Sequence, residues 1–122
     1  MDPGDIYLGV KGQEKQLYGG NREVIPIPVE EANIRRAAGK KLLGDAIRRY
    51  TNYQINYGVI PGPEHDTLKE LYNLGQNLNL IVIQRNGVPE SSEVKMTWTS
   101  GKIKSTNGDW LWEGDSILLE AV

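Results

Sequence analysis

The chain has 122 residues and a mass of 13.6 kDa, with 14 Lys and Arg against 16 Asp and Glu, no Cys, no Phe and one His. A chain of this length can bury about two thirds of the surface that its unfolded form exposes, so one domain with a hydrophobic core is feasible. The absence of cysteine excludes disulfides and Cys-based metal sites, and the net charge of −2 argues against a generally basic nucleic-acid binder.

Alternation of apolar and polar residues predicts a mainly β chain. Weaker strand patterns occupy residues 6–10, 24–27 and 32–43, and Gly39 is a candidate turn within the last of these. The clearest pattern lies in residues 51–60, where four apolar residues share one face at period two: Tyr53, Ile55, Tyr57 and Val59. We therefore expect a half-buried strand with one solvated face in this segment.

One helix is predicted over residues 62–75. Pro61 and Pro63 precede it, acidic residues stand at its positive end, and Gly75 is placed to end it. Thr67 and Glu70 have capping-box spacing, and the alternative is that Thr67 already lies inside the helix. A helix of about three turns is not stable alone, so we expect it to pack on the sheet.

Two strands joined by Asn86-Gly87 predict a hairpin from about residue 78 to residue 99, because Asn-Gly favours tight hairpin turns. A second Asn-Gly pair at 107–108 precedes one or two short closing strands, in which we expect Trp110 and Trp112 to share a face.

Candidate catalytic and cofactor sites are weak. His65 lies between Glu64 and Asp66, but acids at a helix start offset the helix dipole and need no further role. The Gly39-Lys40 pair lacks the other residues of a phosphate-binding loop. We expect no catalytic residues, no cofactor and no bound metal.

The aromatic residues allow two interpretations. They are Trp98, Trp110, Trp112, Tyr50, Tyr53 and Tyr57. Together they could stack sugars or single-stranded nucleic acid, or they could fill the core and a subunit interface in a chain without Phe. We favour the core or the subunit interface.

Charge is unevenly distributed along the chain. Residues 32–50 carry six bases and one acid, whereas residues 1–31 and 51–122 are both acidic. The basic segment is either a solvated face or an electrostatic contact with a neighbouring copy or with nucleic acid. Self-complementary packing of this kind produces rings or tubes. We hypothesise that the basic residues contribute to a subunit interface: Arg35, Arg36, Lys40, Lys41, Arg48 and Arg49.

The order of these patterns resembles small tail proteins of phages and prophages. The resemblance covers residues 32–122 and includes "NIRRAAGKKLLGDAIRRYTNYQINYGVI", then "HDTLKELYNL", a strand, "NG" and the terminal "WLWEGDSILLEAV". Asp45, Arg48 and Arg49 occupy the positions of an Asp followed by a basic pair. The first third, with "GGNREVIPIPVEEAN", matches no motif of this group.

The resemblance implies a tail-tube-like fold, which is a β-sandwich or rolled barrel with one flanking α-helix. The sequence has no low-complexity tract, no repeat and no Ser/Gly linker, so we expect a single domain over residues 1–122. Long arms of such tail proteins bridge subunits, and residues 11–35 have the composition of such an extended arm or long loop. The expected function is that of a non-enzymatic structural component of a phage or phage-derived tail, which forms rings or a tube around the DNA channel.

The expected partners are copies of the chain in a hexameric ring, other tail proteins, and DNA that passes through the lumen without sequence-specific binding. No apolar run approaches the length of a membrane span and no secretory signal is evident, so we expect no membrane partner. The expected location is the virion tail, after synthesis in the cytoplasm of a bacterial host. The alternative is a small β-barrel that binds single-stranded nucleic acid.

Overall fold

The computed structural model describes the backbone of residues 2–36 and 42–122, and the side chains of residues 2–30 and 49–122. The elements are, in chain order, β1 (Ile6–Gly9), β2 (Lys15–Gln16), β3 (Arg22–Arg36), β4 (Leu42–Tyr57), β5 (Val59–Pro61), α1 (Gly62–Asn73), β6 (Leu78–Ile83), β7 (Pro89–Thr99), β8 (Lys102–Ser105), β9 (Leu111–Glu113) and β10 (Ser116–Ala121). The mainly β class with one helix is confirmed.

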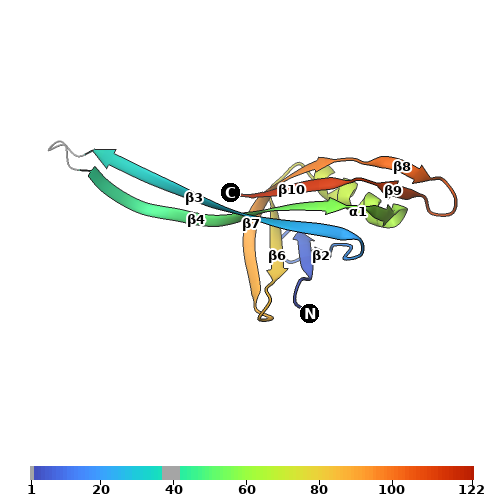
Figure 1. Cartoon of the computed structure of the whole chain (residues 1–122), viewed down its shortest axis with the longest axis horizontal. Coiled ribbons are helices and arrows are strands. Elements are labelled where there is room, and N and C mark those ends of the chain that lie inside the picture. Colours follow the sequence, from blue (N-terminus) through green and yellow to red (C-terminus); the bar gives the residue numbers. More distant parts are fainter. Residues whose placement is uncertain (1, 37–41) are drawn as a thin grey trace.

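The strands form two antiparallel sheets (Figure 1). The larger sheet has seven strands in the order β2-β1-β6-β7-β10-β4-β3, and the smaller has three in the order β5-β9-β8. Helix α1 contacts β5, β7 and β9, so it lies against both sheets. The core contains buried side chains from α1 and both sheets, including Leu68, Leu71, Ile55, Ile60 and Ile117. This arrangement is a β-sandwich with a helix on its flank.

Helix α1 begins and ends close to the predicted positions. Pro61 is the N-cap, Glu64 is the acid of the first turn, and the chain leaves the helix before Gly75, which has a φ of 64°. Of the two interpretations of Thr67, its position inside the helix is confirmed and the capping box is not, because the helix starts at Gly62. The Thr67 hydroxyl instead donates a hydrogen bond to the Pro63 carbonyl oxygen at 3.1 Å.

The hairpin predicted at residues 78–99 is confirmed as β6 and β7. The Gly87 N–H donates to the Gln84 oxygen at 2.8 Å, and the Gln84 N–H donates to the Val88 oxygen at 2.9 Å. Gly87 has a φ of 83°, which places a left-handed residue at the end of a three-residue loop. The glycine is therefore required by the turn itself.

The strand predicted at residues 51–60 ends earlier than its alternating pattern suggests. Ile55 and Tyr57 are buried in β4, but the chain bends at Gly58, and β5 then buries Ile60 instead of Val59. The Gly58 N–H donates to the Asn21 oxygen at 2.8 Å, and an added Cβ at Gly58 would lie 2.7 Å from the Asn21 side chain. This close approach explains both the bend and the glycine.

The two C-terminal tryptophans differ from their expected arrangement. Trp112 lies in β9, whereas Trp110 belongs to the preceding turn with a φ of 67° and is 43% exposed. The closing strands themselves are confirmed as β9 and β10.

The longest elements, β3 and β4, form one hairpin that projects from the body (Figure 1). The strand patterns at residues 24–27 and 32–43 both belong to this hairpin, and Gly39 lies outside the described residues. The segment expected to form an arm, residues 11–35, divides in the structure. Residues 15–16 form the edge strand β2, while residues 22–35 belong to β3.

Candidate assembly surface

The part of the β3–β4 hairpin beyond the body is a two-stranded ribbon, which we call the arm and define as residues 28–36 and 42–51. The strands pair from Arg22 opposite Tyr57 to Arg36 opposite Leu42. On its other side, β4 pairs with β10 only from Asn56 to Tyr53. At about 3.4 Å per residue, the stretch of β4 within the arm spans roughly 30 Å.

The structure brings two of the predicted basic residues opposite two acids. Arg49 pairs in register with Glu30, and Arg48 with Glu31. The Arg49 Nε lies 3.7 Å from the Glu30 Oε2, and the side chains are 73% and 57% exposed. Exposed ion pairs of this kind contribute about 0–1 kcal/mol to the free energy of unfolding. The pair therefore agrees with the register of the hairpin but adds little to the stability of the fold.

The other predicted basic residues lie further along the arm. In register, Arg35 is opposite Leu43 and Arg36 is opposite Leu42, while Lys40 and Lys41 lie outside the described residues. Residues 32–47 thus carry four bases and one acid. The sequence patterns did not predict that Glu30 and Glu31 are register partners of Arg49 and Arg48. Glu30-Glu31 and Arg48-Arg49 are equally far in the sequence from residues 39–40. A hairpin centred on residues 39–40 would place the two pairs opposite each other, so the spacing alone could have predicted this pairing.

Two prolines remove backbone donors from the outer edge of β3. The Tyr57 N–H donates to Asp115 in the turn before β10, and the Gly58 N–H donates to Asn21 on the β3 side. Because backbone groups alternate along a strand, odd-numbered residues of β4 from Ile47 to Tyr57 face the β10 side, and even-numbered residues of this stretch face β3. Pro26 is opposite Tyr53 and Pro28 is opposite Thr51, so both proline nitrogens face outward. They remove no ladder hydrogen bond and leave the outer edge without two donors.

The outer edge of β4 is open where β10 turns away from it. The Ala121 N–H donates to the Asn52 side-chain oxygen at 2.8 Å, and the Val122 N–H donates to the Glu93 oxygen on β7 at 3.0 Å. Beyond this point β10 no longer covers β4, and Figure 1 shows the C-terminus where the arm leaves the body.

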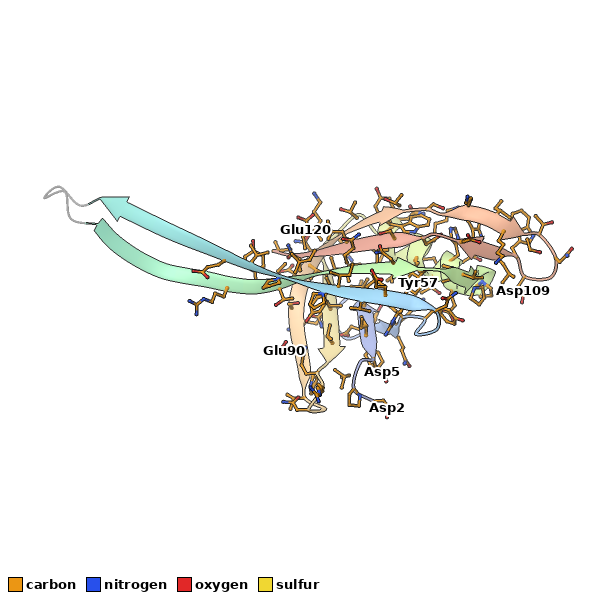
Figure 2. The ribbon with its side chains drawn as sticks, in the orientation of Figure 1. Asp2, Asp5, Tyr57, Glu90, Asp109 and Glu120 are labelled. Atoms are coloured by element: carbon orange, nitrogen blue, oxygen red, sulfur yellow. The ribbon has the colours of Figure 1, made fainter. Side chains whose placement is uncertain are left out.

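A groove of about 340 Å³ lies in the corner between β4 and β7. Residues from four strands line it: Arg49, Tyr50, Thr51, Tyr53, Val82, Glu90, Ser91, Ser92 and Ala121. Figure 2 shows Glu90 and Glu120 at the end of the body from which the arm departs. This corner therefore combines an open strand edge with nearby negative charge.

A second cluster of polar groups lies inside the body, around His65. The His65 Nε2 is 3.2 Å from the Ser100 Oγ and 3.4 Å from the Asp115 Oδ2. Asp115 is fully buried and also accepts hydrogen bonds from the Gly101 N–H at 2.7 Å and the Trp98 Nε1–H at 3.2 Å. The expectation that His65 only marks a helix start is thus incomplete, because its side chain is 5% exposed and links α1 to Asp115.

This cluster lacks the geometry of a Ser-His-Asp triad. In a triad, one ring nitrogen contacts the serine and the other contacts the carboxylate. Here the same nitrogen of His65 faces both groups, and the Nδ1 is buried without a hydrogen-bond partner. The ring also stacks on Trp112, with centroids 3.7 Å apart. The arrangement holds elements together and does not present a nucleophile with its base.

Most of the aromatic side chains face the core. Trp98, Trp112 and Tyr53 pack against the core cluster, and Tyr57 is 3% exposed. Within the described residues, no cluster of His, Asp and Glu is placed to hold a metal ion. In the same part of the chain, no helix has the length and apolar character needed to cross a membrane.

Comparisons with known proteins give one structural similarity. No protein-family model and no curated protein matches the chain. The fold is similar to a chain in the cryo-EM structure of the anti-feeding prophage baseplate, with a TM-score of 0.45 and 9% sequence identity. That similarity covers all of this chain and 90% of the other.

Proposed function

We propose that the protein is a non-enzymatic structural component of a phage or phage-derived tail, and that it assembles through the arm. The observation that carries this proposal is the ribbon itself, in which β4 continues well beyond its last pairing with β10 at Tyr53. A two-stranded ribbon is at best marginally stable in water by itself. A surface on another molecule that covers the arm would stabilise it.

Charge supports a contact between copies of the chain. Residues 32–47 are basic, whereas the remainder of the chain is acidic. Heterologous contacts between a basic arm and an acidic body close into rings or continue into tubes. We propose a hexameric ring around a DNA channel, with other tail proteins above and below it, in the virion tail. The sequence resemblance to small tail proteins supports this assignment.

The alternative of a single-stranded nucleic-acid module has less support. Such modules stack bases on exposed aromatic side chains. In this chain Trp98, Trp112 and Tyr53 pack against the core, and Tyr57 is buried. The basic residues of the arm are therefore not accompanied by a platform of those aromatic rings.

An arm-shortened variant tests the proposal. Replacing residues 32–47 by Asn-Gly joins Glu31 to Arg48, which pair directly and can flank a two-residue turn. We expect the wild type to form concentration-dependent assemblies in light scattering and the shortened variant to be monomeric with an unchanged melting temperature. A wild type that stays monomeric at all concentrations would contradict the proposal. Steep salt-dependent binding to an oligonucleotide would favour the alternative.

A further inference from the structure

We propose that Asn107 is a site of spontaneous deamidation in the folded protein, with water as the only co-reactant, whereas Asn86 is protected by its turn. This inference does not depend on the proposed role in assembly. Each asparagine precedes a glycine, which has no Cβ to hinder attack by its own backbone nitrogen. The two Asn-Gly pairs therefore have the same local chemistry and differ in their surroundings.

Deamidation joins the side chain of an asparagine to the backbone nitrogen that follows it. At Asn107, the Gly108 nitrogen loses its proton to a base and attacks Cγ, and the side-chain nitrogen leaves as ammonia. Water then opens the cyclic imide at Cγ, which gives Asp, or at the main-chain carbonyl carbon, which gives isoaspartate. The net reaction consumes water and releases ammonia without oxidation. It requires a backbone N–H that is not hydrogen-bonded and a side-chain amide that can turn toward it.

The turn at Asn86 occupies both of the reacting groups. The Gly87 N–H donates to the Gln84 oxygen at 2.8 Å, so the attacking nitrogen is held by the bond that closes the turn. The Asn86 Oδ1 accepts a hydrogen bond from the Val88 N–H at 3.0 Å, which fixes the side-chain amide. Both hydrogen bonds must break before the Gly87 nitrogen can reach the Asn86 Cγ.

The turn at Asn107 occupies neither group. The Trp110 N–H donates to the Asn107 oxygen at 3.4 Å, so Asn107 is the first residue of the turn and Gly108, with a φ of 63°, is the second. The N–H of the second residue takes no part in the bond that closes a β-turn. In the part of the chain that the structure describes, neither the Gly108 N–H nor the Asn107 side chain has a hydrogen-bond partner. Both residues are exposed, so water reaches them.

Deamidation at Asn107 would alter the contact between this turn and the start of α1. Isoaspartate routes the main chain through its side chain, which lengthens the backbone by a methylene carbon. The next two residues of the turn contact Gly62: an added Cβ there would overlap the Asp109 oxygen, and the Gly62 N–H donates to the Trp110 oxygen at 2.8 Å. A longer turn displaces these groups, so we expect the isoaspartate form to melt at a lower temperature.

Peptide mapping tests each asparagine separately. Cleavage after Lys and Arg by trypsin releases residues 86–95 and 105–122, each of which contains a single Asn and no Gln. The mass increase of each peptide therefore reports deamidation at one position. After incubation of the folded full chain at mildly alkaline pH, we expect Asn107 to convert about tenfold faster than Asn86, which corresponds to about 1.4 kcal/mol of additional barrier. Incubation in urea, which unfolds both turns, should make the two rates similar.

Asn107→Gln is the matched variant, because ring closure from glutamine requires a larger ring and is slower. We expect incubation to lower the melting temperature of the wild type and to leave that of Asn107→Gln unchanged. Equal rates at the two asparagines in the folded protein, or the same difference in rate in urea, would overturn the inference. An isoaspartate form that melts with the unmodified protein would contradict the expected effect on the Gly62 contact.

Discussion

The His65 Nε2 lies 3.4 Å from the Asp115 Oδ2, and both side chains are buried although 50 positions separate them in the sequence. Asp115 also accepts hydrogen bonds from Trp98 and from the Gly101 backbone, so one carboxylate connects α1, β7 and the β9–β10 turn. This contact therefore links three segments of the body that are distant in the sequence.

Removing the Asp115 carboxylate should destabilise the body strongly. In Asp115→Ala, the Trp98 Nε1–H and the Gly101 N–H lose their acceptor, and we expect the free energy of unfolding to fall by about 3 kcal/mol. Urea unfolding measures this change, and Asp109→Ala at an exposed position is the matched control. A loss below about 0.5 kcal/mol would show that Asp115 does not hold these elements together.

Tyr57 should make the fold sensitive to alkaline pH. Burial raises the pKa of Tyr57 above its usual value of 10.0, although the nearby Arg22 acts in the opposite direction. Above about pH 10 the unfolded chain loses this proton while the folded chain retains it. The contribution of protonated Tyr57 to the free energy of unfolding is therefore complete below about pH 10, and it is lost as the pH rises through the pKa of Tyr57 in the folded chain.

Tyr57→Phe separates this effect from packing. The Tyr57 hydroxyl is buried without a hydrogen-bond partner. We therefore expect the free energy of unfolding of the variant to lie within about 1 kcal/mol of that of the wild type at neutral pH. Its stability should fall less between pH 9 and pH 11 in urea unfolding. Tyr72→Phe, at an exposed position, should follow the wild type. Equal pH slopes for Tyr57→Phe and the wild type would contradict the role of Tyr57.

Gly62 permits the turn before β9 to pack on the start of α1. An added Cβ at Gly62 would overlap the Asp109 carbonyl oxygen, and the Gly62 N–H donates to the Trp110 oxygen at 2.8 Å. We expect Gly62→Ala to lower the stability by about 2 kcal/mol, because the backbone of the turn must move. Gly19→Ala, where only the Arg22 guanidinium lies at 4.0 Å, should change the melting temperature little. Equal melting temperatures for the two variants would disprove the close contact.

The two prolines of β3 should act as protection against uncontrolled strand pairing. Replacing Pro26 and Pro28 by Thr restores two outward N–H donors on an edge strand. We expect the double variant to keep the melting temperature of the wild type but to aggregate faster on concentration, as followed by turbidity. Replacing Pro89, which begins β7, by Thr is the control. Unchanged solubility of the Pro26 and Pro28 variant would mean that the outer edge of β3 is protected in another way.

Local patterns predicted the elements that are determined by nearby residues. The helix at Gly62–Asn73 and the β6–β7 hairpin follow from Pro61, Gly75 and Gly87, whose conformational preferences act within a few residues. The buried pair of His65 and Asp115 could not be predicted, because it depends on tertiary packing between distant segments. The end of β4 at Gly58 depends in the same way on the approach of Asn21.

The basic segment was recognised from the sequence, but its surroundings were not. Counting charges by position identified Arg48 and Arg49, whereas only the hairpin register places Glu31 and Glu30 opposite them. Reversing the two arginines alone would therefore place four acids together and could unfold the arm. A four-site exchange, Glu30→Arg and Glu31→Arg with Arg48→Glu and Arg49→Glu, keeps the pairs within the arm and reverses the charges that β4 presents.

The most direct test of assembly through the arm is the molar mass by light scattering of the wild type and this four-site variant, across a range of concentrations at low salt. We expect concentration-dependent assemblies for the wild type and a folded monomer for the variant, because strand β4 of the arm would then present two acids instead of two bases to the acidic body of a neighbouring copy. Equal assembly of the two proteins would contradict the account.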